Sequence, residues 1–474
     1  MRFSSFDALL AHQARELGER PALCFAGADS PCSWQRFDRL VRERAEFWRR
    51  SGKTCLGVFC DGSFDCVRNI FAANLAGLQV VLLDENTPDE QLPGLLAYTD
   101  ADVLWGDEDL CSALTPALTG GVTGGAGRLL FFTSGTTDSS KAVVLTDASL
   151  CASAWNGNEL LPLSGNDRLL CLLPLNHVFG FVCGLLWGLQ AGACVALSEP
   201  RRAFTAFSDI RPTAVSLVPA QLGYLLKAGS FNPELKTVLI GAGDCPASLL
   251  HAGRQAGLNI SVGYGLTETS SGVALSAEGN PNAMTLCPDA RITFASDGEI
   301  LVSAPACMMQ GYYKRPTDTA AVLSDGVLHT GDLGALDGRG RLRVTGRKKE
   351  MLVLADGTKI FLPEYEAEIG AVLGTADLAV VLRDGRPVLV LSGAEEPKEV
   401  LLQKLSGVLS GHPRGQQLTD IMILGEPLPR TATGKLRRWA IARRLESLCR
   451  PEMKSWTVPR KSSTTASPSW RENR

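Results

Sequence analysis

Apolar segments alternate with helical patterns through the first half of the chain. The segment TCLGVF (54–59) precedes a pattern that places Val67 and Phe71 on one helical face, and LQVVLLD (78–84) follows it. Further strand-like segments lie at 128–132, 193–197, 214–218 and 237–241. This strand–helix–strand order predicts parallel sheets covered by helices. We therefore expect an α/β fold whose large N-terminal domain consists of sheets built from βαβ units.

The pattern changes from about Asp297. Short strand-like segments separated by Gly, Asp and Pro follow at 298–304, 341–346, 350–354, 378–382 and 387–392. Asp384 and Gly385 predict a hairpin turn between the last two strands, and amphipathic helical patterns at 399–409 and 434–445 complete a small α+β domain. We place the large domain at residues 1–346 and the small domain at 347–449. Residues 450–474, rich in Ser, Thr, Pro, Arg and Lys, are expected to be disordered.

Residues 169–198 form an apolar segment that is long enough to span a bilayer. Pro174, Asn176 and Gln190 interrupt this segment, and such groups need partners that lipid does not supply. We therefore expect a buried strand, a turn at Asn176 and a helix of small residues through Leu185, and no membrane span.

The composition is typical of a soluble globular protein. A chain of 474 residues exceeds what one core usually supports, so two or more domains are expected. The net charge of -3, with no long basic run, argues against nucleic-acid partners. None of the 14 cysteines is spaced as C-x-x-C, and no Cys and His cluster resembles a zinc site. Reduced thiols and the lack of a signal-peptide pattern predict a cytoplasmic location.

The segment FFTSGTTDSSKAVVLT (131–146) crowds hydroxyl groups around a glycine and adds one lysine between two strand-like runs. Glycine lets backbone N–H groups turn inward, hydroxyls donate hydrogen bonds, and a cation offsets the charge of a phosphate. The spacing is not that of the G-x-x-x-x-G-K-[ST] phosphate loop. Taken alone, the segment is either a phosphate-binding loop or a polar turn.

Four further segments follow in order: VGYGLTETSS (262–271), HTGDLG (329–334), GRKKEMLVLADGTKI (346–360) and LPRTATGKLRR (428–438). With the first, they resemble the core motifs of the adenylate-forming (AMP-binding) superfamily, which includes acyl-CoA and aryl-CoA synthetases, nonribosomal peptide adenylation domains and luciferases. The resemblance extends from about residue 5 to residue 445. It implies an AMP-forming acid–thiol ligase that uses ATP and Mg²⁺ to convert a fatty or aromatic acid to an acyl adenylate, releases pyrophosphate, and transfers the acyl group to coenzyme A.

The resemblance also implies roles for individual residues. Tyr264 would stack on adenine beside Gly265, and Asp332 would bind the ribose hydroxyls with Arg347 as a second partner. The residues expected to contact the phosphates are the loop residues Thr133, Ser134, Gly135, Thr136, Thr137 and Lys141, together with Thr267 at the α-phosphate and the metal ligand Glu268.

Two lysines near the small domain receive roles from the same resemblance. Lys435 would bridge the substrate carboxylate and the α-phosphate during adenylation. Lys349 matches the hinge about which a mobile small domain rotates before the thiol attacks. Each assigned residue alone has a structural alternative: Glu268, for example, could simply be a carboxylate favoured by a helix N-terminus, and Asp332 a turn residue.

Two residues of the loop depart from the family pattern. Asp138 stands where the family usually has glycine, and Ser140 stands where it usually has proline. An aspartate that faced phosphate would repel it by about 1 kcal/mol in a solvated setting, so we expect Asp138 to point outward.

The segment PLNHVFGF lacks the aspartate with which amino-acid-activating relatives bind an ammonium group. His177 resembles the histidine that lies beside the carboxylate in acyl- and aryl-CoA synthetases, although a buried structural histidine would also fit. An uncharged acyl or aromatic acid is therefore expected. Two alternatives stay open: transfer to a separate acyl carrier protein, and a non-catalytic ligand-binding or scaffold protein.

Overall fold

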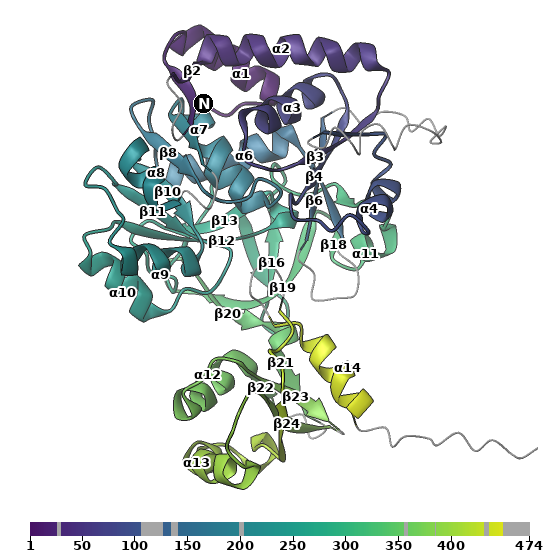
Figure 1. Ribbon diagram of the computed structural model, residues 1–474, viewed down its shortest axis with the longest axis vertical. Helices are drawn as coiled ribbons and strands as arrows, with labels where there is room; N and C mark the ends of the chain where they lie inside the picture. The colour runs from purple at the N-terminus through teal and green to yellow at the C-terminus, as the bar shows by residue number, and fades with distance from the viewer. Residues whose placement is uncertain are drawn as a thin grey trace, which may run out of the picture. The chain divides into compact units, whose positions relative to one another are not determined.

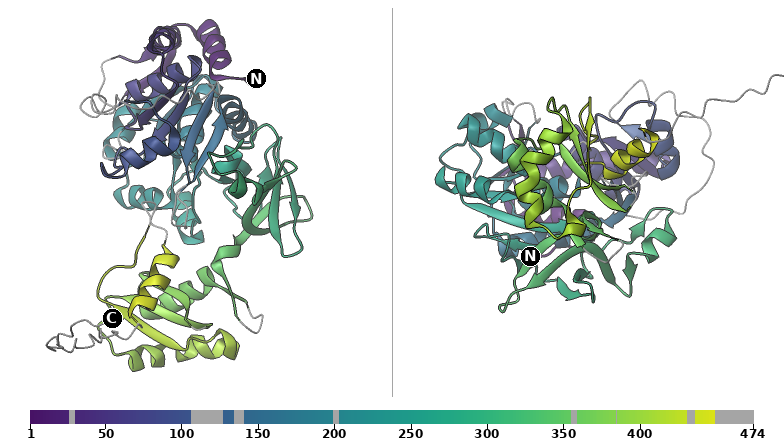
Figure 2. Two further views of the ribbon diagram at one scale, coloured as in Figure 1. Left: turned by 90° about the vertical axis from the view of Figure 1, so that its right-hand side faces the viewer. Right: turned by 90° about the horizontal axis from the view of Figure 1, so that it is seen from below.

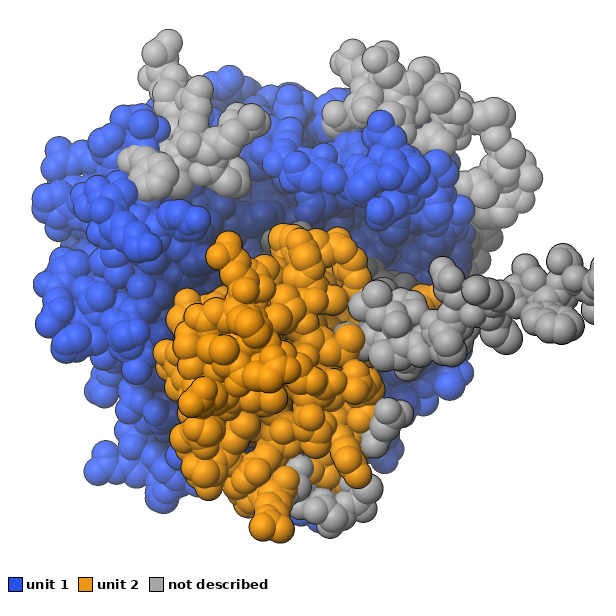
Figure 3. Space-filling view, turned by 60° about the horizontal axis from the view of Figure 1, so that its bottom comes forward, with its two compact units in different colours: residues 1–351 blue, residues 352–474 orange. Residues whose placement is uncertain are grey.

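The computed structural model describes residues 1–25, 30–105, 127–133, 141–198, 203–354, 359–383, 385–430 and 436–448. The chain divides into two compact units, Met1–Met351 and Leu352–Arg474 (Figure 3). The first unit is a mixed α/β structure and the second a small α+β structure, as predicted. The sequence placed the boundary after residue 346, and Lys349 lies between that position and the division after Met351.

A nine-stranded sheet contains three of the six strands predicted for the parallel sheets. Its order is β14 (Thr285–Leu286), β13 (Ser271–Ser276), β12 (Ile260–Leu266), β11 (Thr237–Ile240), β10 (Ala214–Leu217), β8 (Arg168–Cys171), β9 (Cys194–Leu197), β1 (Pro21–Phe25) and β2 (Cys32–Ser33). Neighbours from β12 to β1 run parallel, whereas β2, β13 and β14 are antiparallel additions. The strands predicted at 193–197, 214–218 and 237–241 are thus confirmed as parallel neighbours or near neighbours.

A six-stranded sheet carries the predicted hydroxyl-rich loop. Its order is β17 (Gly311–Tyr312), β7 (Ala142–Thr146), β6 (Arg128–Phe132), β4 (Gln79–Leu83), β3 (Cys55–Phe59) and β5 (Val103–Trp105). Helix α3 (Phe64–Leu75) connects β3 to its parallel neighbour β4, and it begins where the Ser63 hydroxyl accepts a hydrogen bond from the Cys66 N–H. Strands β6 and β7 pair antiparallel, from Arg128 opposite Thr146 to Phe132 opposite Ala142.

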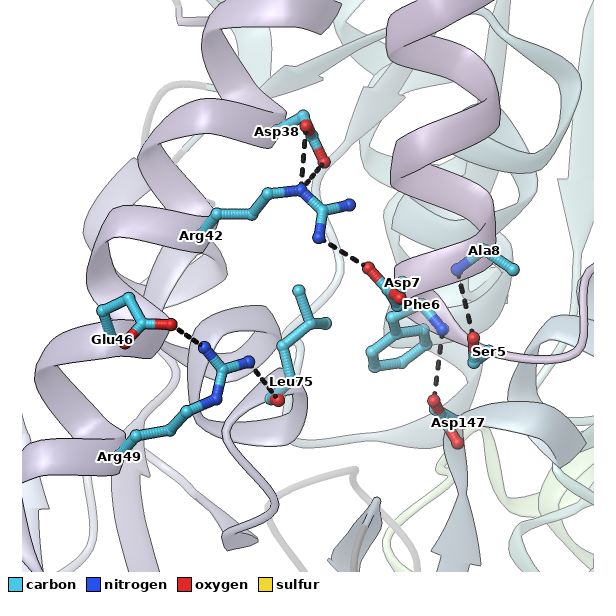
Figure 4. Close-up of polar contacts among 10 residues, drawn as sticks. All are labelled: Ser5, Phe6, Asp7, Ala8, Asp38, Arg42, Glu46, Arg49, Leu75 and Asp147. Carbon is cyan, nitrogen blue, oxygen red and sulfur yellow. Dashed lines mark hydrogen bonds and ion pairs between the residues drawn. The ribbon is translucent and has the colours of Figure 1, made fainter.

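Helices cover these sheets (Figure 1). They are α1 (Phe6–Leu17), α2 (Trp34–Ser51), α4 (Leu92–Thr99), α6 (Asp147–Leu160), α7 (Trp187–Ala191), α8 (Ala203–Ile210), α9 (Pro219–Ala228), α10 (Ala247–Gln255) and α11 (Pro316–Ala320). A large buried cluster joins α1, α2 and α3 to both sheets and includes Phe6, Trp34 and Phe71. Arg42 on α2 pairs with Asp38 and with Asp7 of α1 (Figure 4).

The chain after β8 departs from the predicted helix geometry. Residues Gly180–Leu186 form a π-helix (η1) that continues into α7. A side-chain carbon on Gly180 would lie 2.2 Å from the Pro174 carbonyl oxygen, and one on Gly188 would lie 2.6 Å from Val195 Cγ2. The small residues predicted from the sequence therefore let this segment approach its own preceding turn and strand β9. No helix among the described residues is long and apolar enough to cross a membrane.

A third sheet in the first unit contains β15 (Arg291–Phe294), β16 (Glu299–Ser303), β19 (Val327–Leu336) and β18 (Leu323–Ser324), with β20 (Leu342–Arg347) paired to β19. All of its pairs are antiparallel. Single turns of 3-10 helix follow two of the strands that carry predicted site residues: η3 (Thr267–Thr269) after β12, and η4 (Lys348–Glu350) after β20.

The second unit contains a three-stranded sheet of β23 (Leu378–Arg383), β24 (Arg386–Ser392) and β25 (Asp420–Leu424). Helices α12 (Leu362–Leu373) and α13 (Lys398–Gly411) cover one face and α14 (Arg438–Leu448) covers the other (Figure 2). The predicted hairpin is confirmed by the β23–β24 pairing, with Arg383 opposite Arg386 and Gly385 at φ 74°; Asp384 lies outside the described residues. The remaining elements are β21 (Met351–Val353) paired with β22 (Lys359–Phe361), and η5 (Arg414–Gln416).

Candidate functional site

Asp332 is a buried carboxylate that contacts two other predicted site residues. Its side chain is only 2% exposed. The Tyr264 hydroxyl donates a hydrogen bond to Asp332 Oδ2 at 2.8 Å, and Arg347 Nε lies 3.0 Å from Asp332 Oδ1. Burial, followed by the charge of Asp332, raises the pKa of Tyr264, so its hydroxyl keeps the proton that it donates. Three residues predicted to bind the adenosine end of a nucleotide therefore lie together.

Strand pairing explains this meeting. Asp332 on β19 stands opposite Arg347 on β20, which brings the two side chains together across an antiparallel pair. Tyr264 lies near the end of β12, just before a register shift at Gly265. A side-chain carbon on Gly265 would lie 1.3 Å from the Ser271 carbonyl oxygen, so only glycine fits there.

Glu299 contacts the backbone on one side of this cluster and a lysine side chain on the other. Its Oε1 accepts the Gly331 N–H at 2.8 Å, and its Oε2 lies 3.0 Å from Lys348 Nζ and 3.4 Å from His329 Nδ1. Burial acts to raise the pKa of Glu299, but Lys348, the Gly331 N–H and His329 outweigh it and lower the pKa. The ionised carboxylate thus connects the residue before Asp332 to the residue after Arg347.

Glu268 and Lys141 lie against one side chain that the sequence prediction missed. The Tyr312 hydroxyl donates to Glu268 Oε1 at 2.7 Å, and Lys141 Nζ lies 4.7 Å from the centre of the Tyr312 ring. Lys141 also forms an ion pair with Asp318 at 3.4 Å. Nothing in the sequence around GYYKRP marks Tyr312 as a site residue, because its importance depends on the pairing of β17 with β7.

The other predicted phosphate contacts are partly described. Thr267 is half-buried on η3, next to Glu268. The Thr133 N–H donates to the Lys141 carbonyl at 2.9 Å, which joins the two ends of the loop. Ser134, Gly135, Thr136, Thr137, Asp138, Ser140 and Lys435 lie outside the described residues. Lys349 is exposed on η4.

Among the described residues, no hydrogen bond or ion pair joins His177 to the two clusters around Asp332 and Glu268. It is half-buried in the turn before η1, where its N–H donates to the Pro174 carbonyl and its carbonyl accepts from the Phe181 N–H. Burial lowers the pKa of His177, and the charge of Asp84 opposes this effect. A neutral imidazole beside an apolar turn can donate or accept one hydrogen bond without adding charge.

The donor set fits a loosely held magnesium ion better than a protein-caged metal. Among the described residues, no three His, Cys, Asp or Glu side chains form a group that could hold a metal. Glu268 offers one carboxylate, and Mg²⁺ is typically held by one or two carboxylates with substrate phosphates and water as its other ligands.

Comparison with known proteins gives three findings. Residues 127–313 match the family model "AMP-binding enzyme". The chain is 32% identical to an indoleacetate–CoA ligase of Aromatoleum aromaticum over 65% of this chain and 66% of that protein. It is 31% identical to a 2-succinylbenzoate–CoA ligase of Listeria monocytogenes over 65% of this chain and 68% of that protein. The aligned part thus spans about two thirds of the length of these relatives.

A solved structure shows the same fold. The o-succinylbenzoate coenzyme A synthetase of Bacillus subtilis, in complex with ATP and magnesium ion, superposes with a TM-score of 0.77. The superposition covers 92% of this chain and 99% of that one, at 22% sequence identity. The predicted fold class is thereby confirmed.

Proposed function

Because the chain belongs to the AMP-binding enzyme family, we propose that it activates a carboxylic acid with ATP, releases pyrophosphate, and transfers the acyl group to coenzyme A. The observation that carries this proposal is the meeting of Tyr264, Asp332 and Arg347 at one buried carboxylate. Asp332 and Arg347 lie on consecutive strands, whereas Tyr264 lies 68 residues before Asp332. The family resemblance assigns all three residues to the same nucleotide.

Asp332 would receive the ribose hydroxyls. A carboxylate accepts hydrogen bonds from two vicinal hydroxyls well, and Arg347 and Tyr264 already hold Asp332 in one orientation. The Tyr264 ring would then lie beside the base, next to Gly265.

Glu268 would be the protein ligand of Mg²⁺. When bound, Mg²⁺ offsets negative charge on the phosphate oxygens. Thr267 would donate its hydroxyl to the α-phosphate, and Lys141 would place its ammonium group near the terminal phosphates. These residues act by position and charge, since no covalent intermediate with the protein is needed.

The barrier to adenylation is electrostatic. A carboxylate must approach a phosphorus atom that is surrounded by negative oxygens, and the leaving pyrophosphate carries further charge. We propose that Lys435 contacts both the acid carboxylate and the α-phosphate, so that it lowers their mutual repulsion. Lys349 is the proposed hinge for the second half-reaction, in which a thiol attacks the acyl adenylate.

The proposed substrate is an aromatic or fatty acid that has no ammonium group. The relatives described above are named for indoleacetate and 2-succinylbenzoate. His177, whose pKa is lowered by burial, would face the acid as a neutral group. Both aromatic and fatty acids therefore belong in the test.

We also propose a cytoplasmic location. The cysteines of the described residues are free thiols, from Cys24 to Cys307, which is the usual state in a reducing compartment.

A screen for pyrophosphate release tests the function. The full chain is incubated with Mg²⁺, ATP and a panel of arylacetic, arylacrylic, benzoic and fatty acids. We expect release with at least one aromatic acid, and thioester formation that saturates with coenzyme A. Saturation by a holo acyl carrier protein in place of coenzyme A would move the acceptor to that protein, and no release with any acid would leave a non-catalytic binding protein.

Lys435→Ala tests the chemical step. We expect it to abolish acyl-adenylate formation while thioester formation from a supplied acyl adenylate stays largely intact. Arg437→Ala, which removes an exposed cation two residues away, is the matched control and should retain both steps. Equal loss of both steps in Lys435→Ala would contradict the assigned role.

A further inference from the structure

Tyr312 separates the two charged side chains that the proposed function directs to the phosphates and to Mg²⁺. Its hydroxyl donates to Glu268 Oε1 at 2.7 Å, while the ammonium group of Lys141 lies over its ring, 4.7 Å from the ring centre. A lysine over an aromatic face is attracted by the ring, and a hydroxyl bonded to a carboxylate is a charge-assisted donor. The Tyr312 side chain therefore contacts the Lys141 ammonium group through the face of its ring and the Glu268 carboxylate through its hydroxyl.

Hydrogen bonds of the backbone hold the segment that carries Tyr312 independently of these two contacts. Strand β17 pairs with β7, with Tyr312 opposite Val143, and the Tyr312 N–H donates to the Thr319 hydroxyl at 2.9 Å. Just before it, the Met309 N–H donates to the Glu268 carbonyl at 2.8 Å, and the Gln310 N–H donates to the Val144 carbonyl at 2.9 Å. The segment thus ties the Glu268 backbone to the strand that follows Lys141.

From this arrangement, which rests on the proposed function, we propose that Tyr312 is a positioning residue for Mg²⁺–ATP. Without the ring, Lys141 and Glu268 would be free to pair with each other, because opposite charges at close range attract even near a protein surface. Such a pair would remove a cation from the phosphates and a ligand from the metal. Tyr312 gives Lys141 and Glu268 a neutral partner in place of each other, while Asp318 is a charged partner of Lys141 at 3.4 Å.

The decisive variant is Tyr312→Phe, which keeps the ring under Lys141 and removes only the donor to Glu268. ATP binding is measured by calorimetry over a series of Mg²⁺ concentrations, and pyrophosphate release is measured over the same series. We expect the Mg²⁺ concentration at half-maximal binding to rise about tenfold, equivalent to about 1.4 kcal/mol, while ATP binding without Mg²⁺ and the KM for the acid stay unchanged.

Tyr313→Phe is the matched control. Tyr313 is the next residue, and its hydroxyl donates to Asp100 Oδ2 at 2.6 Å, so the variant removes an equivalent bond to a carboxylate outside the proposed site. It should leave the Mg²⁺ dependence as in the wild type. In the Glu268→Gln background, Tyr312→Phe should add little further change, because the carboxylate that it positions is already gone.

Tyr312→Leu tests the ring. This variant should weaken ATP binding even without Mg²⁺, because Lys141 loses the aromatic ring that its ammonium group contacts. An unchanged Mg²⁺ dependence in Tyr312→Phe, or an equal change in Tyr313→Phe, would overturn the inference while leaving the proposed function intact. A wild-type chain that binds no ATP would overturn both.

Discussion

Gly180→Ala should destabilise the fold and disturb the turn that carries His177. The new methyl group would lie 2.2 Å from the Pro174 carbonyl oxygen, whereas ordinary contacts begin near 3.4 Å, so the two groups must separate by about 1.2 Å. Both groups are attached to the backbone, so neither can rotate away. Overpacking of this kind costs typically 1–3 kcal/mol, and we expect about 3 kcal/mol because the obstacle is a carbonyl oxygen.

Gly157→Ala is the matched control, and its expected effect on stability has the opposite sign. Gly157 lies inside α6, and a side-chain carbon there meets nothing within 4 Å. Alanine in an open helix position stabilises by about 0.5–1 kcal/mol. The two variants therefore make the same chemical change at two helical glycines and differ only in the space around them.

Urea unfolding followed by tryptophan fluorescence measures both changes. Five of the eight tryptophans lie in residues 1–351, at Trp34, Trp48, Trp105, Trp155 and Trp187, so the signal reports mainly on the first unit. Because the Pro174 carbonyl accepts the His177 N–H, Gly180→Ala should also lower pyrophosphate release. If Gly180→Ala unfolds within 0.5 kcal/mol of the wild type, or Gly157→Ala is the less stable of the two, the steric reasoning is wrong.

Three other predictions concern the buried polar groups. Tyr264→Phe removes a hydrogen-bond donor from the Asp332 carboxylate, which is 2% exposed. It should lower the free energy of unfolding in urea by about 2 kcal/mol, and by much less in the Asp332→Asn background. Equal losses in the two backgrounds would contradict the coupling between Tyr264 and Asp332. Burial lowers the pKa of His177 from 6.5, so its contribution to stability is present above about pH 6.5 and is lost as the pH falls further. His177→Gln should therefore make the free energy of unfolding less dependent on pH between pH 5 and pH 6.5. An unchanged pH dependence would count against burial as the cause. The pKa of Glu299 is lowered from 4.5, so its contribution to stability is present above about pH 4.5 and is lost below it. In thermal unfolding, Glu299→Gln should be less stable than the wild type at pH 7, and this difference in stability should narrow towards pH 3.

Much of the fold could be predicted from local pattern. Alternation of apolar segments and helical faces located β3, α3 and β4 within a residue or two, because the Ser63 cap and the periodicity of Val67 and Phe71 are local signals. The hairpin of β23 and β24 was equally local. The π-helix at Gly180–Leu186 was not predictable, because it depends on how closely Gly180 and Gly188 approach other parts of the fold.

Some residues of the site could also be predicted from the sequence, and others could not. The motif resemblance pointed to Tyr264, Asp332 and Arg347, and the structure brings them together; their roles toward a nucleotide stay predictions. Tyr312 and Glu299 could not be found, because each is defined by contacts to segments far along the chain. Tyr312 lies 44 residues from Glu268, and Glu299 lies 49 residues from Lys348.

The pairing of β6 with β7 holds the two ends of the hydroxyl-rich loop together, so the loop can be exchanged as a unit. Phe132 pairs with Ala142, and the Thr133 N–H bonds to the Lys141 carbonyl, so the sheet holds both ends at one place whatever residues stand at 134–140. A transplant of equal length from a relative, with glycine for Asp138 and proline for Ser140, would keep the cost of closing the loop nearly constant. Differences in turnover between such chimeras would then report on the chemistry of the loop alone, and they offer a route to tuning the proposed activity without repacking the core.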